Sequence, residues 1–248
     1  MGAREQVAEG QRWSTTPRSS AMPQPVSVLR LVEEGPAVEA LEPTFISAPT
    51  DAWQRLVKRS FDVAVATGLL VLLAPVLLAA GVAIRLESRG PALFRQWRVG
   101  LNGKAFRIFK LRTLTVREDG DRITQVTRDD PRLTRLGRIF RKISFDELPQ
   151  LLNVVRGEMS LVGPRPHAVA HDRYFAERIE SYALRLSVKP GLTGWAQVHG
   201  LRGETATVDQ MRRRVNFDLW YARHAGLRLD LRILVATPRA VLRGRNAW

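Results

Sequence analysis

Hydrophobic residues are distributed unevenly along the chain, and the longest uncharged run covers residues 63–84. Nearly every residue in this run is Val, Leu, Ala or Ile, and a run of this length is long enough to enter or cross the hydrocarbon of a bilayer. Residues 1–55 are rich in Pro, Ser, Thr, Ala and Glu and lack a sustained apolar period, which predicts a disordered tail. The pattern therefore divides the chain into a tail (1–55), a membrane segment (56–86) and a further domain (87–248).

Pro75 falls near the middle of the membrane segment, where a proline removes a backbone donor and clashes with the preceding turn. Two alternatives follow: a kinked helix that spans the bilayer, or two helical arms that enter the membrane and return to the same face. Lys58 and Arg59 precede the segment and Arg85 and Arg89 follow it. Since the positive-inside rule places both flanks in the cytoplasm, the charges favour re-entry.

A β-hairpin is predicted over residues 94–111, because apolar residues roughly alternate on each side of Asn102-Gly103. This dipeptide tolerates positive φ and suits a two-residue primed turn. Lys110 and Arg112 share one side of an extended strand, so we expect them to converge on one anion.

The stretch from Leu227 to Arg243 alternates apolar and basic residues with a helical period. It predicts either an amphipathic helix lying on lipid or a surface helix packed on the core.

The formal net charge of +15 and the pI near 11.4 imply an anionic partner, which is nucleic acid, an anionic membrane or a phosphorylated substrate. The chain has no cysteine, which excludes disulfides, thiolate metal sites and a cysteine nucleophile. It also contains no Walker loop and no Rossmann fingerprint, and its four histidines have no convincing zinc spacing.

Asp146 and Glu147 are adjacent carboxylates that allow two interpretations. In the first, Ser144 and Glu147 form a capping box at a helix start. In the second, the pair belongs to a phosphate site. Pro149 disturbs the helix start, arginines lie on both sides, and the prolines flanking Arg165 lower the entropy cost of holding its guanidinium on a phosphate. With a divalent cation, such a carboxylate can attack phosphorus and form an acyl phosphate.

Five motifs occur in one order along the chain: Lys110-Leu-Arg-Thr113, Asp146-Glu-Leu-Pro-Gln150, Gly157-Glu-Met-Ser160, Gly163-Pro-Arg-Pro166 and Lys189-Pro-Gly-Leu-Thr-Gly-Trp-Ala-Gln197. In this order they resemble the bacterial sugar transferases, which are monotopic polyprenyl-phosphate hexose-1-phosphate transferases. The resemblance covers about residues 55–248. It implies a mainly α protein with a small β-hairpin, a proline-broken re-entrant membrane helix, interfacial amphipathic helices and a catalytic domain on the cytoplasmic face of the bacterial inner membrane.

The resemblance also implies an activity and a set of site residues. Asp146 matches the nucleophile, which attacks the sugar-bearing phosphate of a UDP-sugar, releases UMP and holds the sugar phosphate until undecaprenyl phosphate attacks. Glu147 matches its partner, and Mg²⁺ is expected at Asp146 and Glu147. The phosphate-binding residues are expected to be Arg141, Lys110, Arg112 and Arg165. The break of the membrane helix is expected at Pro75, where the family's Ser-Pro is Ala74-Pro75.

Two questions of function remain open at this level. A membrane-anchored nucleic-acid-binding protein is the rival class, but the arginines lie among Pro, Gly and carboxylates beside the apolar segment, so no nucleic-acid partner is expected. The ending Asn246-Ala247-Trp248 resembles members that transfer glucose or galactose phosphate, which favours exopolysaccharide initiation with a neutral hexose over an N-acetylated sugar.

Overall fold

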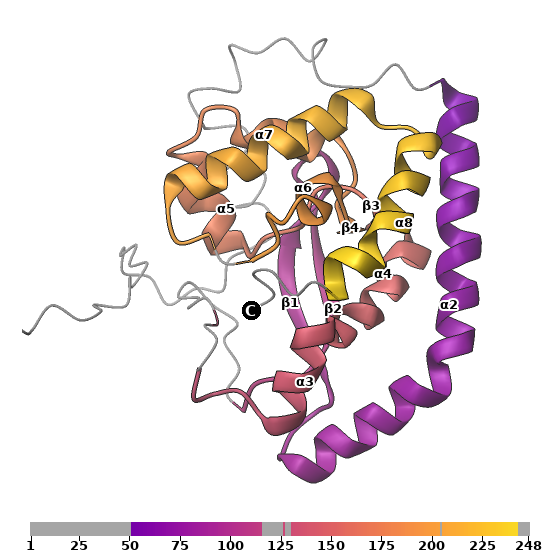
Figure 1. The fold of residues 1–248 in the computed structure, drawn as a ribbon, viewed down its shortest axis with the longest axis vertical. Helices are drawn as coiled ribbons and strands as arrows, with labels where there is room; N and C mark the ends of the chain where they lie inside the picture. Colours follow the sequence, from indigo (N-terminus) through magenta and orange to yellow (C-terminus); the bar gives the residue numbers. More distant parts are fainter. Residues whose placement is uncertain (1–50, 116–125, 127–129, 204, 243–248) are drawn as a thin grey trace, which may run out of the picture.

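The computed structural model describes residues 51–115, 126, 130–203 and 205–242. The expected disordered tail, apart from residues 51–55, and the Asn246-Ala247-Trp248 ending lie outside the described residues. Within the described part the protein is mainly helical, with two small two-stranded sheets and one long apolar helix near its N-terminal side (Figure 1).

The long helix is α2 (Ala52–Glu87), which spans 36 residues and contains Pro75. Among the described residues it is the one helix that is long and apolar enough to cross a membrane. The helix continues through Pro75, and Figure 1 shows it running along one side of the molecule and then bending beneath it. A proline inside a helix is a sufficient cause for such a bend. The proline therefore bends α2 without dividing it into two separate helices.

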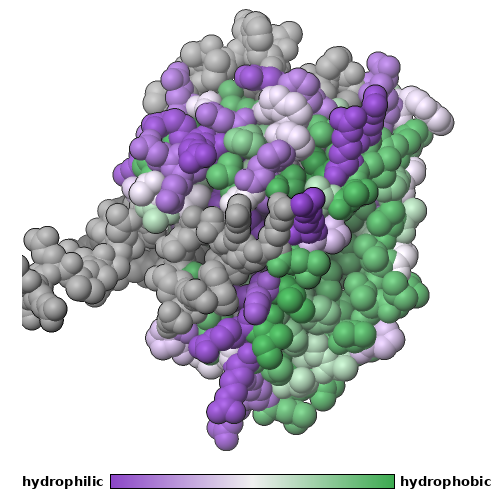
Figure 2. Space-filling view, in the orientation of Figure 1, coloured by the Kyte–Doolittle hydropathy of each residue, from purple (hydrophilic) through white to green (hydrophobic). Residues whose placement is uncertain are grey.

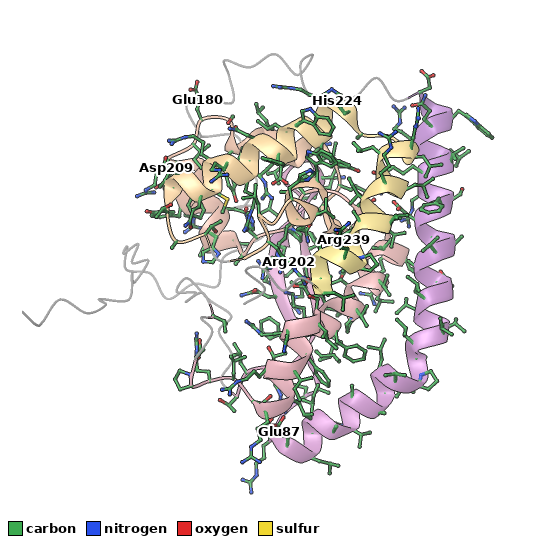
Figure 3. The ribbon with its side chains drawn as sticks, viewed as in Figure 1. Glu87, Glu180, Arg202, Asp209, His224 and Arg239 are labelled. Carbon is green, nitrogen blue, oxygen red and sulfur yellow. The ribbon has the colours of Figure 1, made fainter. Side chains whose placement is uncertain are left out.

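Both ends of α2 contact the same domain. Near the N-terminal end, Arg59 donates to the carbonyls of Val154 at 2.6 Å and Val155 at 2.9 Å, in the last turn of α4 (Leu151–Arg156). At the other end the Glu87 carboxylate accepts from the Arg135 backbone N–H at 2.7 Å, at the start of α3 (Arg135–Ile143). Figure 3 shows Glu87 at the lower end of the molecule.

A buried polar cluster fixes the N-terminal half of α2. Lys58 donates to Asp230 on α8 (Leu227–Leu242) and to Ser160 Oγ at 2.9 Å, and its Nζ lies 3.8 Å from Asp62 Oδ2. Tyr221 donates to Asp230 Oδ1 at 2.7 Å. The cluster joins the apolar helix to the domain through charged groups that would be costly in lipid.

The hairpin prediction is confirmed. Strands β1 (Leu93–Val99) and β2 (Ala105–Leu111) pair antiparallel and are joined by the short turn η2 (Leu101–Gly103). Asn102 has φ 52° and Gly103 has φ 74°, and the Lys104 N–H donates to the Leu101 carbonyl at 3.1 Å. Positive φ at both central residues is the geometry for which Asn-Gly is favoured.

The second sheet was not predicted. Strand β3 (Ser160–Val162) lies parallel to β4 (Gly191–Thr193), with Val162 opposite Thr193. Strands of three residues are too short to show a period in the sequence. The remaining elements are α5 (Val169–Ala176), η4 (Tyr182–Ser187), α6 (Trp195–Val198) and α7 (Val208–His224).

The main core lies between α2, the hairpin and the β3–β4 sheet. Buried side chains from all three meet there, among them Ala66, Phe106, Ile108, Leu151, Met159 and Val162. The partly buried Leu229 and Leu234 of α8 pack against the same core. Because α8 also exposes Leu231, Val235 and Leu242, one of its sides packs on the core, as predicted for a surface helix, and another side presents apolar residues outward.

The close approach of β3 and β4 leaves no room for a side chain at Gly191. A Cβ at this position would overlap the backbone of Gly163, immediately before Pro164-Arg165. We expect Gly191→Ala to lower the free energy of unfolding by about 2 kcal/mol, because the two strands must separate. Gly68→Ala in α2 is the control, since a Cβ there meets nothing within 4 Å. Chemical denaturation of both variants would measure this, and equal stabilities would contradict it.

Candidate active site

The two adjacent carboxylates lie on the short helix η3 (Phe145–Gln150), directly after α3. Ser144 joins the two helices with φ 57° and ψ 25°, in the left-handed region. Its side chain makes no capping hydrogen bond, so the capping-box prediction is wrong. The physical reason is that the Glu147 carboxylate is attracted by buried cations from other parts of the chain, which are stronger partners than a backbone N–H.

Glu147 is held by two cations. Arg165 donates from Nη1 to Oε2 at 2.9 Å and from Nη2 to Oε1 at 2.6 Å, and Lys110 donates to Oε1 at 2.8 Å. Burial would raise the pKa of Glu147, but the charges of Arg165 and Lys110 outweigh it and hold that pKa well below its usual value. Glu147 is therefore a fixed anion at neutral pH, and both of its oxygens are occupied.

Asp146 is in a different environment. Its side chain is buried, yet it makes no hydrogen bond to any of the residues that the structure describes. Burial, and then the charge of Glu147, raise the pKa of Asp146, while Lys110, Arg141 and Arg165 oppose that shift. A carboxylate whose oxygens are not engaged in hydrogen bonds keeps its lone pairs for a new bond, so the two adjacent carboxylates differ in what they can do chemically.

Arg141 lies beside both carboxylates without bonding either of them. Its Nε donates to Thr113 Oγ1 at 2.9 Å. Burial lowers the pKa of Arg141, and the charges of Asp146 and Glu147 oppose the shift. The structure thus brings together four of the residues singled out from sequence besides Asp146: Glu147, Arg141, Lys110 and Arg165.

Arg112 lies apart from this group. Its guanidinium donates to the carbonyls of Ser88 at 2.6 Å and Ile84 at 3.2 Å, and also to the Arg89 carbonyl, all at the end of α2. The prediction that Lys110 and Arg112 converge on one anion is therefore wrong. Alternate residues share a side only while a strand continues, and β2 ends at Leu111.

Two arginines that the sequence did not single out belong to the same neighbourhood. Arg98 donates to Gln96 Oε1 at 2.6 Å, and burial, followed by the charge of Arg165, lowers its pKa to about 10. Arg202 has a buried Nη1 atom with no hydrogen-bond partner among the described residues. Burial lowers the pKa of Arg202, and the charges of Glu147 and Asp146 act against this shift. Figure 3 shows Arg202 near the centre of the molecule.

The cations Arg98, Lys110, Arg141, Arg165 and Arg202 all interact electrostatically with the carboxylate of Glu147. Five positive groups around two carboxylates leave an excess of positive charge in a partly desolvated place. Such an arrangement favours an anion with several phosphate oxygens. The sequence signal for Arg202 was weak, namely its place between Gly200 and Gly203 shortly after the last motif.

The carboxylates also bear on the expected Mg²⁺ site. No group of three or more His, Asp or Glu side chains suited to a metal occurs within the described ranges. Since both Glu147 oxygens are engaged by cations, Asp146 is the carboxylate of the pair that can ligate. One protein carboxylate together with substrate phosphates is a common ligand set for Mg²⁺, so the residues present fit a metal that arrives with its substrate.

The buried carboxylate of Asp172 has a raised pKa. Tyr182 donates to Asp172 Oδ1 at 2.7 Å, while Oδ2 is buried without a hydrogen-bond partner among the described residues. Burial raises the pKa of Asp172 to about 6. The folded state therefore binds a proton between about pH 4 and 6 that the unfolded chain releases, so this group makes the protein more stable as the pH falls through 6.

We expect Asp172→Asn to remove this part of the pH dependence. Between pH 7.5 and 5 the wild type should gain about 1.4 kcal/mol relative to the variant, as the buried carboxylate takes up its proton. Urea denaturation of both proteins at the two pH values measures the difference. Parallel pH dependences would show that Asp172 does not titrate in this range.

A long apolar helix beside a buried, cation-lined carboxylate is an arrangement suited to anionic substrates. Residues 53–244 match the model of the family described as bacterial sugar transferase, and the chain belongs to this family. It is 56% identical over 191 residues to the UDP-glucose:undecaprenyl-phosphate glucose-1-phosphate transferase of Caulobacter vibrioides, with 77% of this chain and 72% of that protein covered.

Two relatives of lower identity match a similar share of this chain. The chain is 48% identical to the Escherichia coli protein of the same name, with 76% of this chain and 41% of the relative covered. It is 39% identical to a UDP-N-acetylgalactosamine-undecaprenyl-phosphate N-acetylgalactosaminephosphotransferase of Aeromonas hydrophila, with 77% of this chain and 45% of the relative covered. The chain thus spans less than half the length of these two relatives.

Proposed function

We propose that the protein transfers glucose 1-phosphate from UDP-glucose to undecaprenyl phosphate and releases UMP, as the first step of exopolysaccharide synthesis. The observation that carries the proposal is the contrast between Asp146 and Glu147. The buried Asp146 carboxylate makes no hydrogen bond to another described residue, and it lies beside one that is fixed by Arg165 and Lys110. The names of the Caulobacter and Escherichia coli relatives support glucose over an N-acetylated sugar.

In the first step a carboxylate oxygen of Asp146 attacks the phosphorus that carries the sugar. The bond from this phosphorus to the bridging oxygen breaks, and UMP leaves with the electron pair. The product is an acyl phosphate that links Asp146 to the sugar. In the second step an oxygen of undecaprenyl phosphate attacks the same phosphorus, and the acyl phosphate bond breaks to regenerate the Asp146 carboxylate.

The basic residues stabilise the negative charge on the reacting phosphates in both steps. Arg165 and Lys110 lie at the Glu147 carboxylate, and Arg141 lies within electrostatic reach of Asp146. Arg98 and Arg202 add two further positive charges to this group. Arg202 Nη1 has no hydrogen-bond partner among the described residues, so it can donate to a phosphate oxygen. We assign none of this binding to Arg112, which is engaged at α2. Mg²⁺, held by Asp146 and the phosphates, would neutralise charge on the diphosphate.

The exposed apolar side chains of the protein support a lipid-linked acceptor. Among the described residues, α2 exposes Val71, Leu72, Val76, Leu78 and Val82, α3 exposes Ile139 and Ile143, and α8 exposes Val235 and Leu242. Figure 2 shows hydrophobic residues gathered on the side of the molecule along which α2 runs. We propose that α2 enters the cytoplasmic leaflet of the bacterial inner membrane and returns, because both of its ends contact one domain and an intervening bilayer would separate them.

The reaction is tested by incubating the purified enzyme with Mg²⁺, undecaprenyl phosphate and a panel of UDP-sugars, and measuring UMP. We expect release from UDP-glucose in amounts matching the lipid phosphate, and at least about tenfold slower release from UDP-N-acetylglucosamine. Faster reaction with an N-acetylated sugar would overturn the assignment of the sugar. The absence of UMP with every donor would overturn the reaction.

The topology gives a separate prediction. Since the chain has no cysteine, single cysteines at Arg55 and Arg89 provide unique labels on the two flanks of α2. In intact spheroplasts we expect a membrane-impermeant maleimide to label neither position, and in inverted vesicles to label both. A position that reacts in spheroplasts while the other reacts in inverted vesicles would show a spanning helix.

A further inference from the structure

A buried polar network contacts the main chain of the Pro164-Arg165-Pro166 segment. Arg185 of η4 is 2% exposed and donates from Nη2 to the backbone carbonyl of Arg165 at 2.6 Å. Its Nε and Nη2 also donate to Asp218 Oδ2 of α7, at 3.0 and 2.8 Å. Arg185 therefore connects α7 to the main chain of the residue whose side chain holds Glu147.

A second arginine of α7 connects to the other basic loop. Arg214 donates from Nη2 to the Gly203 carbonyl at 2.5 Å, immediately after Arg202, and its Nη1 lies 3.3 Å from His167 Nε2. His167 directly follows Pro166. Arg214 thus contacts residues next to both phosphate-facing segments.

Both arginines contact the buried ring of His167. Nδ1 lies 3.0 Å from Arg185 Nη1 and 2.7 Å from the Tyr182 hydroxyl, which also contacts Asp172 Oδ1 at 2.7 Å. Nε2 lies 3.3 Å from Arg214 Nη1, so a guanidinium group, which can only donate, faces each ring nitrogen. Burial, and then the charges of Arg185 and Arg214, lower the pKa of His167 well below its usual value, which agrees with a neutral ring.

We propose that Arg185 and Arg214 are positioning residues that fix the Arg165 and Arg202 segments relative to each other, so that both guanidinium groups meet a diphosphate in one preformed arrangement. The inference rests on the proposed function. The physical argument is that buried charges such as these stabilise a fold no better than apolar residues of similar volume, whereas they define geometry strictly. Donors fixed in advance do not have to reorganise when the anion arrives.

Arg185→Lys tests the proposal. Lysine keeps the positive charge opposite Asp218, but a single ammonium cannot reproduce the fork that reaches both Asp218 and the Arg165 carbonyl. We expect KM for UDP-glucose to rise about tenfold with kcat changed less than about threefold, because binding common to the ground and transition states is lost. We also expect the Kd for inorganic pyrophosphate, measured by calorimetry, to rise about tenfold.

The matched control is Tyr221→Phe. This buried residue of α7 donates to Asp230 and to the Val162 carbonyl but contacts none of the basic residues of the site. It should lower the melting temperature and leave KM and the pyrophosphate Kd unchanged. If Arg185→Lys behaves in the same way, with a lower melting temperature and unchanged binding, the network is only structural and the proposal is overturned.

Tyr182→Phe keeps the proposal testable if Arg185→Lys does not fold. It preserves the ring and removes only the hydroxyl between His167 and Asp172, and a rise of about threefold in the pyrophosphate Kd is expected. An unchanged Kd in this folded variant would also overturn the proposal. If the wild type binds pyrophosphate but releases no UMP from UDP-glucose, the proposed function fails, while the comparison of pyrophosphate affinities still decides the positioning role.

Discussion

We expect replacement of Asp146 by asparagine to reduce transfer of the sugar phosphate by at least about 10³-fold, because an amide in this position cannot form the acyl phosphate. Radiolabelled UDP-glucose, without the lipid acceptor, should label the wild type covalently and leave Asp146→Asn unlabelled after denaturing electrophoresis. The fold should be retained, since the Asp146 side chain makes no hydrogen bond to the described residues.

Asp209→Asn is the control for this experiment. Asp209 lies at the edge of the molecule in the first turn of α7, where its side chain is 84% exposed (Figure 3). This variant should be labelled like the wild type. Covalent labelling that persists in Asp146→Asn would contradict the assignment of Asp146 as the nucleophile.

Replacement of Glu147 by glutamine should have the second largest effect, and it should act on both stability and the pH profile. Lys110 and Arg165 would lose their buried counter-charge, at a cost of about 3 kcal/mol. The negative charge of Glu147 is one of the causes that raise the pKa of Asp146, after burial. Without it, the freed cations and the lost repulsion both lower that pKa.

Asp146 should therefore ionise at a lower pH in Glu147→Gln. The acid limb of kcat/KM should move to lower pH, while the maximal rate falls because Arg165 and Lys110 lose their anchor. The comparison needs full pH profiles of UMP release together with denaturation curves. Glu158→Gln is a suitable control, because Glu158 accepts from Asn153 outside the site. An acid limb that moves to higher pH would show that Glu147 does not act on Asp146 through its charge.

The parts of the molecule differ in how far their structure could be predicted from the sequence. The hairpin was predictable because Asn102 and Gly103 tolerate the positive φ that the turn requires. The long helix was predictable because an uncharged run of this composition and length has few alternatives. The β3–β4 pair was missed because each strand has only three residues and its partner lies about thirty residues away.

Asp146, Glu147, Lys110 and Arg165 were found through motifs and Arg141 through the family resemblance, and the structure brings all five into one neighbourhood. Arg112 was placed there wrongly, because its motif does not reveal that the carbonyls at the end of α2 are its partners. Arg98 and Arg202 were missed, because a chain with many arginines gives no indication of which of them become buried beside a carboxylate.

The sequence by itself determined the hairpin, the long apolar helix and the order of motifs that carries the family, because these depend on neighbouring residues and on hydrophobic period. Only the tertiary structure decided which of the two adjacent carboxylates is bound by cations. Glu147 pairs with Lys110, 37 residues away, and Arg165, 18 residues away, while Asp146 makes no side-chain hydrogen bond to another described residue. Competition among distant donors for one acceptor depends on how the loops pack, and that information is absent from the local sequence pattern.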